Sequence, residues 1–292
     1  MKSLDKLPTP ENLDEVAQND VLERNQFIAN FIRLLASIEG HYSIALDGRW
    51  GSGKTFFVKQ TERVIKEFYN VNSISKQKIE ISFIERVKNI KNSFQKKTKE
   101  NKKDESNRTL HAVFEKLLPL ELNDTIANHM MTFYYDAWQH DSHQDALISL
   151  IGEILKNSPT INPLLNIKQP SARKIYDKMI VAAKGIANKV SGINFEEFND
   201  IADEILQGKQ KQEDLESFIK DFFENLIPDN SSHLVIFIDE LDRCKPDYAV
   251  QLLERIKHYM LIDRITFVFS LNYDQLQHTI KRYYGDDFEA SM

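Results

Sequence analysis

Residues 48–55 read Gly48-Arg49-Trp50-Gly51-Ser52-Gly53-Lys54-Thr55 and match the pattern G-x-x-x-x-G-K-[ST]. The spacing of this pattern wraps the backbone around a phosphate group, so that successive N–H groups point inward. It directs Lys54 to the β- and γ-phosphates and the Thr55 hydroxyl to Mg²⁺. A short apolar run, HYSIALDG, precedes the motif, and a helical pattern over 54–69 follows it. The stretch therefore predicts a phosphate-binding loop between a strand and a helix.

A second motif lies at 233–242, where the sequence reads HLVIFIDELD. The apolar run predicts a strand covered by helices on both faces. Asp239 and Glu240 end it, and two carboxylates at the end of a buried strand are costly unless they are used. Beside a phosphate loop, the first carboxylate holds the water shell of Mg²⁺ and the second polarises the attacking water. The structural alternative is that Glu240 caps the turn or pairs with Arg243.

The next buried strand, ITFVFSL, ends in Ser270-Leu271-Asn272. In ATPases with a catalytic glutamate, the corresponding strand lies between the phosphate-loop strand and the carboxylate strand. Asn272 is therefore a candidate contact of the γ-phosphate or of the attacking water. An asparagine in an ordinary strand-end turn is the alternative interpretation.

Strands and helices alternate along the chain, which predicts an α/β fold with an open parallel sheet. The expected strands lie near 42–47, 132–137, 234–239 and 265–271. The expected organisation is a flexible leader at 1–19 and a P-loop domain at 20–292. That domain carries a basic insertion at about 72–128 and a helical insertion at about 156–230.

Composition and charge narrow the class of protein. The 292 residues are 41% hydrophobic and 28% charged, as in a globular protein with a large core. The net charge of the chain is −6, but the segment 76–108 is basic, with 11 Lys/Arg and five Asp/Glu. Nucleic-acid binding by this segment is not favoured, because Phe83 and Phe94 are its only aromatic residues. The single cysteine, Cys244, excludes a disulfide framework and fits a cytoplasmic protein, and no run approaches the roughly 20 apolar residues of a membrane span.

Two other patterns are weaker. Asn101-Lys102-Lys103-Asp104 has the guanine-reading form N-K-x-D, but it lies in a charged run and follows no hydrophobic strand, which disfavours a GTPase. His140 and His143 lie near several aspartates, but polar residues after a strand are more often solvated than metal-binding.

The chain resembles the KAP family of P-loop NTPases. LDGRWGSGKTFFVKQ (46–60) resembles the family's phosphate loop, and VIFIDELDRCKPDYAVQLLERIK (235–257) resembles its carboxylate motif. FYYDAWQHD (133–141) is similar to its aromatic-Ala-Trp signature, with Asp136 where the family is expected to have asparagine. The tail at 271–292 is similar to the helix after the third strand motif. Together these matches cover 20–70, 130–155 and 233–292.

The resemblance implies an ATPase with a catalytic glutamate that often works as an oligomer. Its bacterial relatives frequently occur in anti-phage or plasmid-linked systems. Two departures stand out. The transmembrane helices of many relatives have no counterpart between the two motifs. A fifth strand and a helical lid would be expected after Gly285, so we expect the sequence to be either a fragment or a short form that borrows these parts.

We therefore expect Mg²⁺-dependent ATP binding and hydrolysis used as a conformational switch. Lys54 stabilises developing charge, Glu240 activates water, Asn272 assists, and Thr55 and Asp239 hold Mg²⁺. The remaining predicted nucleotide contacts are Gly48, Trp50, Gly51, Ser52, Gly53 and Phe56, with Leu22 and Arg24 as candidates for the adenine side. Arg243 is expected to pair with Asp242. Expected partners are a homo-oligomer or a second protein, without a membrane. The alternative functions are a regulatory nucleotide-binding module with negligible turnover and a small-molecule kinase.

Overall fold

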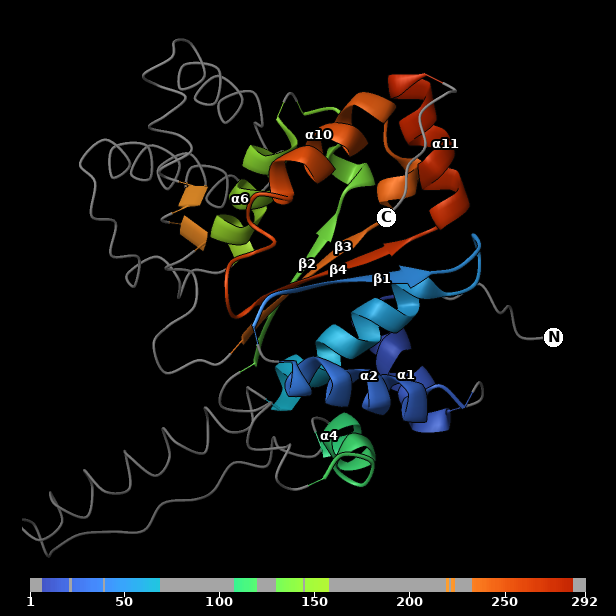
Figure 1. The fold of residues 1–292 in the computed structure, drawn as a ribbon. Helices are drawn as coiled ribbons and strands as arrows, with labels where there is room; N and C mark the ends of the chain where they lie inside the picture. The colour runs from blue at the N-terminus through green and yellow to red at the C-terminus, as the bar shows by residue number, and fades with distance from the viewer. Residues whose placement is uncertain are drawn as a thin grey trace, which may run out of the picture. The chain divides into compact units, whose positions relative to one another are not determined.

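The computed structural model describes residues 7–20, 23–38, 40–68, 108–119, 130–143, 145–157, 219–220, 222–223 and 233–285 (Figure 1). The chain divides into two compact units. The first comprises Met1–Ile38, Thr55–Thr132 and Ser231–His233, and the second comprises Glu39–Lys54, Phe133–Asn230 and Leu234–Met292.

The second unit is built on a four-stranded parallel sheet. Its strands are β1 (Tyr42–Asp47), β2 (Met130–Asp136), β3 (His233–Asp239) and β4 (Ile265–Leu271), in the spatial order β1-β4-β3-β2 (Figure 1). In the register of β4, Leu271 lies opposite Asp47 of β1 and Ser270 lies opposite Asp239 of β3. All four predicted strands are confirmed. So is the prediction that β4 lies between the phosphate-loop strand and the carboxylate strand.

Burial along the strands follows their place in the sheet. Every residue of β3 and β4 is buried, because central parallel strands are covered on both faces. Residues of β1 are exposed or half-buried throughout. Among the described residues, β1 pairs only with β4 and is thus an edge of the sheet.

Three helices of the second unit lie on the same side of the sheet in Figure 1: α6 (Ala146–Asn157), α10 (Pro246–Ile256) and α11 (Tyr273–Tyr284). Helix α10 packs against both α6 and α11. The buried Tyr135 hydroxyl of β2 lies 2.9 Å from Ser149 Oγ of α6 and 2.6 Å from the Tyr248 hydroxyl of α10. This polar contact fixes the strand against two helices at once.

The first unit is helical and corrects one expectation. It contains α1 (Pro10–Asn19), α2 (Asn25–Ser37), the helical residues 55–68 and α4 (Arg108–Glu115). Residues 10–19 were expected to belong to a flexible leader, but they form α1. The Thr9 hydroxyl accepts from the Asn12 N–H, and Pro10 occupies the first helical turn, where its missing donor costs nothing. Leu13 and Ala17 are the buried residues of this helix.

Most of both predicted insertions lies outside the described residues. Of the basic insertion, 108–119 are described and include α4, whereas 72–107 and 120–128 are not. Of the helical insertion, the described residues are 156–157, 219–220 and 222–223. Ile219, Phe222 and Phe223 are buried, and the ring of Phe223 lies 5.2 Å from that of Tyr259.

Candidate active site

The predicted phosphate loop connects β1 to the helical residues 54–68. Gly51 and Gly53 have φ angles of +77° and +85°, a region that residues with a Cβ atom rarely adopt. A Cβ atom on Gly48 would lie 2.9 Å from Ser52 Oγ, too close for ordinary packing. The backbone of the loop therefore requires glycine at these positions. The loop leads directly into a helix N-terminus, whose free N–H groups favour an anion.

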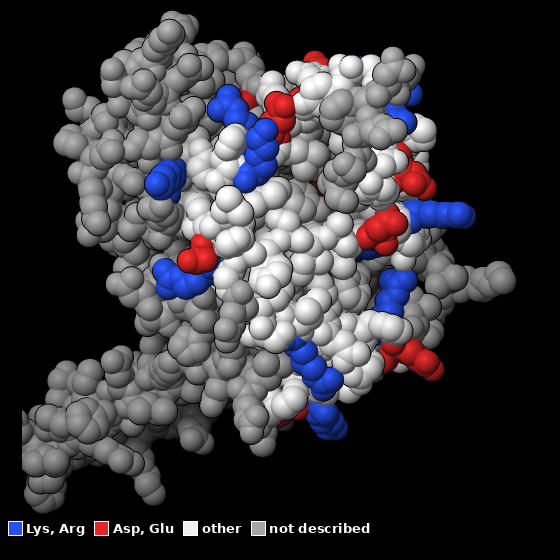
Figure 2. All heavy atoms as spheres, viewed as in Figure 1, with Lys and Arg blue, Asp and Glu red and all other residues white. Residues whose placement is uncertain are grey.

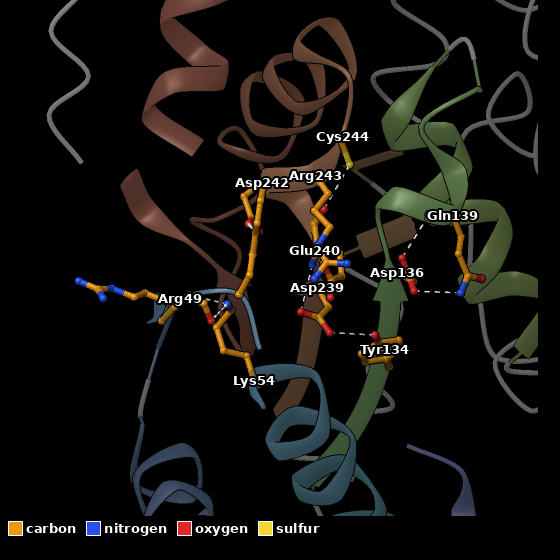
Figure 3. Close-up of polar contacts among 12 residues, drawn as sticks. Arg49, Lys54, Tyr134, Asp136, Gln139, Asp239, Glu240, Asp242, Arg243 and Cys244 are labelled. Atoms are coloured by element: carbon orange, nitrogen blue, oxygen red, sulfur yellow. Dashed lines mark hydrogen bonds and ion pairs between the residues drawn. The ribbon is translucent and has the colours of Figure 1, made fainter. Parts of the chain in front are cut away.

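Lys54 is the first residue of that helix, and its side chain folds back over the loop. Its Nζ donates hydrogen bonds to the carbonyl oxygens of Gly48, at 2.5 Å, and Arg49, at 3.3 Å (Figure 3). These bonds keep the ammonium group at the loop. A fixed cation beside a helix N-terminus is the arrangement that phosphate binding needs.

Strand β4 supports the loop from the side. The Gly48 N–H donates to the carbonyl oxygen of Leu271 at 3.2 Å, where β1 and β4 end together. The next residue, Asn272, is the N-cap of α11, and its Oδ1 accepts from the Gln275 N–H at 3.2 Å. The structure thus gives the side-chain oxygen of Asn272 a capping role. The predicted contact with phosphate or water stays a prediction.

Asp239 lies at the end of β3 and is only 1% exposed. Its Oδ1 accepts from the Glu240 N–H at 3.0 Å, and its Oδ2 accepts from the Tyr134 hydroxyl at 3.0 Å (Figure 3). Burial raises the pKa of the Tyr134 hydroxyl, and the nearby Asp239 charge raises it further, so the phenol stays protonated and donates. The two donors hold the Asp239 carboxylate in one orientation.

Ser270 lies opposite Asp239 in the register of β4 and β3. Its side chain is fully buried, and its Oγ has no hydrogen-bond partner in the described part of the chain. Paired residues of parallel strands place their side chains on the same face of the sheet. A water bound to a cation, or a phosphate oxygen, would supply the hydrogen-bond partner that this hydroxyl lacks.

Glu240 follows Asp239 in an unusual backbone conformation. Its φ is +61°, in the left-handed region, where a residue with a side chain costs about 1–2 kcal/mol. Its Oε2 accepts from Nε of Arg243 at 2.5 Å, and the two side chains are 18% and 36% exposed. The ion pair between these residues, considered as the structural alternative from the sequence, is therefore present.

Arg243 contacts two indole rings. Its guanidinium carbon is 5.7 Å from the ring centroid of Trp50 and 5.6 Å from that of Trp138. Asp242, expected to pair with Arg243, instead accepts a hydrogen bond from Nε1 of Trp50 at 2.7 Å. The expected Asp242–Arg243 pair was wrong.

The sequence did not single out Tyr134, Trp138 or Ser270 as functional residues. Tyr134 carried a signal, since it lies on the strand beside β3 in the aromatic segment 133–141. Trp138 also lies in that segment, but its contact with Arg243 depends on the strand order. The importance of Ser270 follows from register, which sequence periodicity alone does not specify.

His140 and His143 form a half-buried network, which corrects the expectation of solvated side chains. Nδ1 of His140 lies 2.8 Å from the Asp136 carbonyl oxygen, and its Nε2 lies 3.5 Å from Glu153 Oε1. Nδ1 of His143 lies 2.6 Å from Ser149 Oγ. Burial alone lowers the pKa of His140, but Glu153 and the Asp136 carbonyl raise it, and the net direction is upward. Burial lowers the pKa of His143 to about 4, and the charge of His140 adds to this effect. Within the described ranges, no group of three or more His, Cys, Asp or Glu side chains is arranged to hold a metal ion.

The predicted adenine-side residues are less well defined. Leu22 lies outside the described residues. Arg24 is the N-cap of α2, in the first unit, and Phe56 is the third residue of the helix at 54–68. Their contact with a nucleotide stays a prediction.

The comparisons with known proteins agree with this geometry. The sequence profile of the KAP family P-loop domain matches residues 24–290. No curated protein matches the chain. In the described segments, no helix has the length and apolar character to cross a membrane.

Proposed function

Because the chain belongs to the KAP family of P-loop NTPase domains, we propose that it binds ATP with Mg²⁺, hydrolyses the γ-phosphate and uses this cycle as a conformational switch. One observation carries the proposal: the hydrogen bond from Trp50 to Asp242, at 2.7 Å, joins the phosphate loop to the carboxylate segment. Phosphate-binding and water-activating groups thus belong to one connected site. This is the arrangement that phosphoryl transfer to water requires.

The residues fit a magnesium ion. Mg²⁺ prefers oxygen ligands and keeps several of its waters. Asp239, with its fixed carboxylate, and the hydroxyl of Thr55 are the proposed ligands, and the unsatisfied Ser270 hydroxyl is suited to a water of the ion's shell. When bound, the ion would neutralise charge on the β- and γ-phosphates.

Lys54 and Glu240 have separate roles in this proposal. Lys54, held at the loop by two carbonyl oxygens, binds the phosphates in the ground state and stabilises charge on the leaving group. Glu240 accepts a proton from the attacking water. In the structure its carboxylate is engaged by Arg243, so it has to reach the water from within that ion pair or after the pair opens.

That ion pair also favours the second candidate function, a regulatory module that binds nucleotide and organises an oligomer with negligible turnover. A carboxylate neutralised by a guanidinium is a weaker base. The two functions differ in turnover and not in binding.

The test compares two variants with the wild-type protein. Lys54→Ala should abolish tight ATP binding, measured by isothermal titration calorimetry, because it removes a contact with the ground-state phosphates. Glu240→Gln should retain binding and lose turnover by about 10²–10⁴-fold, the typical contribution of a general base. Wild-type binding without measurable phosphate release would support the regulatory module. Equal loss of binding in both variants would contradict the assigned roles.

The partners and the biological role are proposed on resemblance to the family. We propose a homo-oligomer or a complex with a second protein, in a bacterial anti-phage or plasmid-linked system. On the face shown in Figure 2, basic and acidic side chains of the described residues are interspersed and not gathered by sign. This distribution does not favour nucleic acid as the partner of that face. Light scattering with and without Mg²⁺ and ATP tests the oligomer: a monomer under both conditions would contradict it.

A further inference from the structure

Arg243 is the contact through which the phosphate loop reaches Glu240. Trp50 belongs to the loop after β1, and Trp138 follows β2, so the two rings come from the two outer strands of the sheet. The guanidinium lies over both rings, 5.7 Å and 5.6 Å from their centroids. Each such cation–π contact contributes about 0.5–1 kcal/mol at a partly exposed site. Together they restrict the arginine to one position.

The restricted arginine in turn orients Glu240. An exposed ion pair gains little, because two flexible side chains lose conformational freedom to form it. Here the arginine has already lost that freedom to the two rings, and Glu240 is only 18% exposed. Figure 3 shows the Arg243 and Glu240 side chains together beside Asp239, at the end of β3. The orientation of the Glu240 carboxylate is thus set by the contacts of Arg243.

Trp50 is itself fixed, because its Nε1 donates to Asp242, which is 3% exposed. The contacts therefore run from the phosphate loop through Trp50 and Arg243 to Glu240. Any movement of Trp50 that accompanies nucleotide binding changes the position of the guanidinium, and with it that of the carboxylate.

We propose that Arg243 is a positioning residue: it holds the Glu240 carboxylate in its working orientation and connects it to the phosphate loop, without touching the nucleotide. This inference rests on the proposed function. Two other roles make different predictions. An arginine that contacts phosphate acts independently of Glu240, and an arginine that only stabilises the fold does not act selectively on turnover.

A double-mutant cycle separates these roles. Arg243→Ala should lower kcat by about tenfold, which is a fraction of the roughly 10²–10⁴-fold that a general base contributes, and leave KM within about twofold. In the Glu240→Gln background, followed under single turnover with radiolabelled ATP, the same substitution should cost less than about twofold. Arg243→Lys, which keeps the charge but not the planar stack, should fall between wild type and Arg243→Ala. Arg282→Ala, which removes an exposed arginine of α11, is the matched control and should leave kcat unchanged. An equal loss in both backgrounds would overturn the proposal.

A second measurement needs no nucleotide. Trp50 and Trp138 are the only tryptophans of the chain, so fluorescence excited selectively at tryptophan, and not at the ten tyrosines, reports these two rings. In the nucleotide-free protein, Arg243→Ala should increase quenching by acrylamide, Arg243→Lys should increase it less, and Arg282→Ala should not change it. Urea unfolding establishes that each variant is folded.

The two measurements also separate this inference from the proposed function. Unchanged quenching in Arg243→Ala, with normal ATP turnover by the wild-type protein, would overturn the inference alone. If Arg243→Ala increases quenching but the wild-type protein binds no ATP in calorimetry, the proposed function would be overturned. The proposed role of Arg243 in turnover would then be overturned as well.

Discussion

The hydrogen bond from Tyr134 to Asp239 offers a sharp test of how the site is held. Tyr134→Phe removes one oxygen atom and keeps the aromatic ring, so packing changes little. The substitution deletes the donor 3.0 Å from Asp239 Oδ2 and leaves the Glu240 N–H on the other oxygen. Asp239 is 1% exposed, and bulk water therefore has little access to replace the lost donor.

The expected magnitude follows from that burial. A hydrogen bond to a charged group contributes about 1.5–3 kcal/mol, and leaving a buried carboxylate oxygen unsatisfied costs a similar amount. We expect the free energy of unfolding to fall by about 2 kcal/mol. Because Asp239 is a proposed Mg²⁺ ligand, its loss of orientation should also weaken Mg²⁺ binding by about 10–100-fold, as for other residues that orient metal ligands.

Urea denaturation measures the first effect, and a Mg²⁺ titration of fluorescent-ATP binding measures the second. Tyr284→Phe is the matched control, because the Tyr284 hydroxyl of α11 donates to the exposed Glu254 side chain of α10. There water replaces the lost donor, and the expected change is below about 0.5 kcal/mol, with the Mg²⁺ midpoint unchanged. Equal destabilisation of the two variants, or an unshifted Mg²⁺ midpoint in Tyr134→Phe, would refute the reasoning.

Three further predictions concern other parts of the chain. The pKa of His143 is lowered to about 4 in the fold, so between pH 4 and about 6.5 the unfolded chain binds the proton more tightly than the folded chain does. The free energy of unfolding should therefore rise with pH over that window by about 1–2 kcal/mol, a value reduced because the ring is half-exposed. Urea unfolding at several pH values measures this rise, and His143→Gln should remove it. The raised pKa of His140 acts oppositely, and its contribution is lost as the pH rises through the folded pKa. Thr9→Ala should cost about 1 kcal/mol in urea unfolding by removing the cap of α1, whereas Thr9→Ser should not. Deleting 95–108 should leave DNA and RNA affinity unchanged at two salt concentrations, and a salt-dependent loss would contradict that expectation.

The sheet was predictable because its signals are local and repeated. Buried parallel strands are continuous apolar runs, and the runs at 233–239 and 265–271 meet that condition at every residue. The position of the 265–271 strand between the other two was predicted from the class of ATPase that the motifs indicate. No run of residues in the sequence specifies that order. The leader was misread because its prolines were taken as a sign of irregular structure. Proline at the first helical turn after threonine is instead a start signal, which the spacing of Leu13 and Ala17 supports.

The site was predictable where one segment supplies the chemistry. The glycines and Lys54 are close in sequence. The positive φ angles of Gly51 and Gly53 and the hydrogen bond from Lys54 to Gly48 all lie within the loop. The contacts of Tyr134, Trp138 and Ser270 join different strands. They depend on strand order and register, which no single segment contains. A reader of the sequence can name these residues but cannot pair them.

The misassigned partner of Arg243 has a local cause that the sequence did contain. Residues 241–243 form a short 3₁₀ helix, in which neighbouring side chains point in directions about 120° apart and side chains three positions apart lie on one line. Asp242 and Arg243 are neighbours and therefore diverge, whereas Glu240 and Arg243 are three apart and meet. The divergence sends Asp242 to the indole of Trp50 and leaves Arg243 for the glutamate and the two rings. One turn of helix thus directs Asp242 to the phosphate loop and Arg243 to Glu240, the residue proposed to activate water. The shape of that turn, set by the positive φ of Glu240 at its start, couples the two halves of the site.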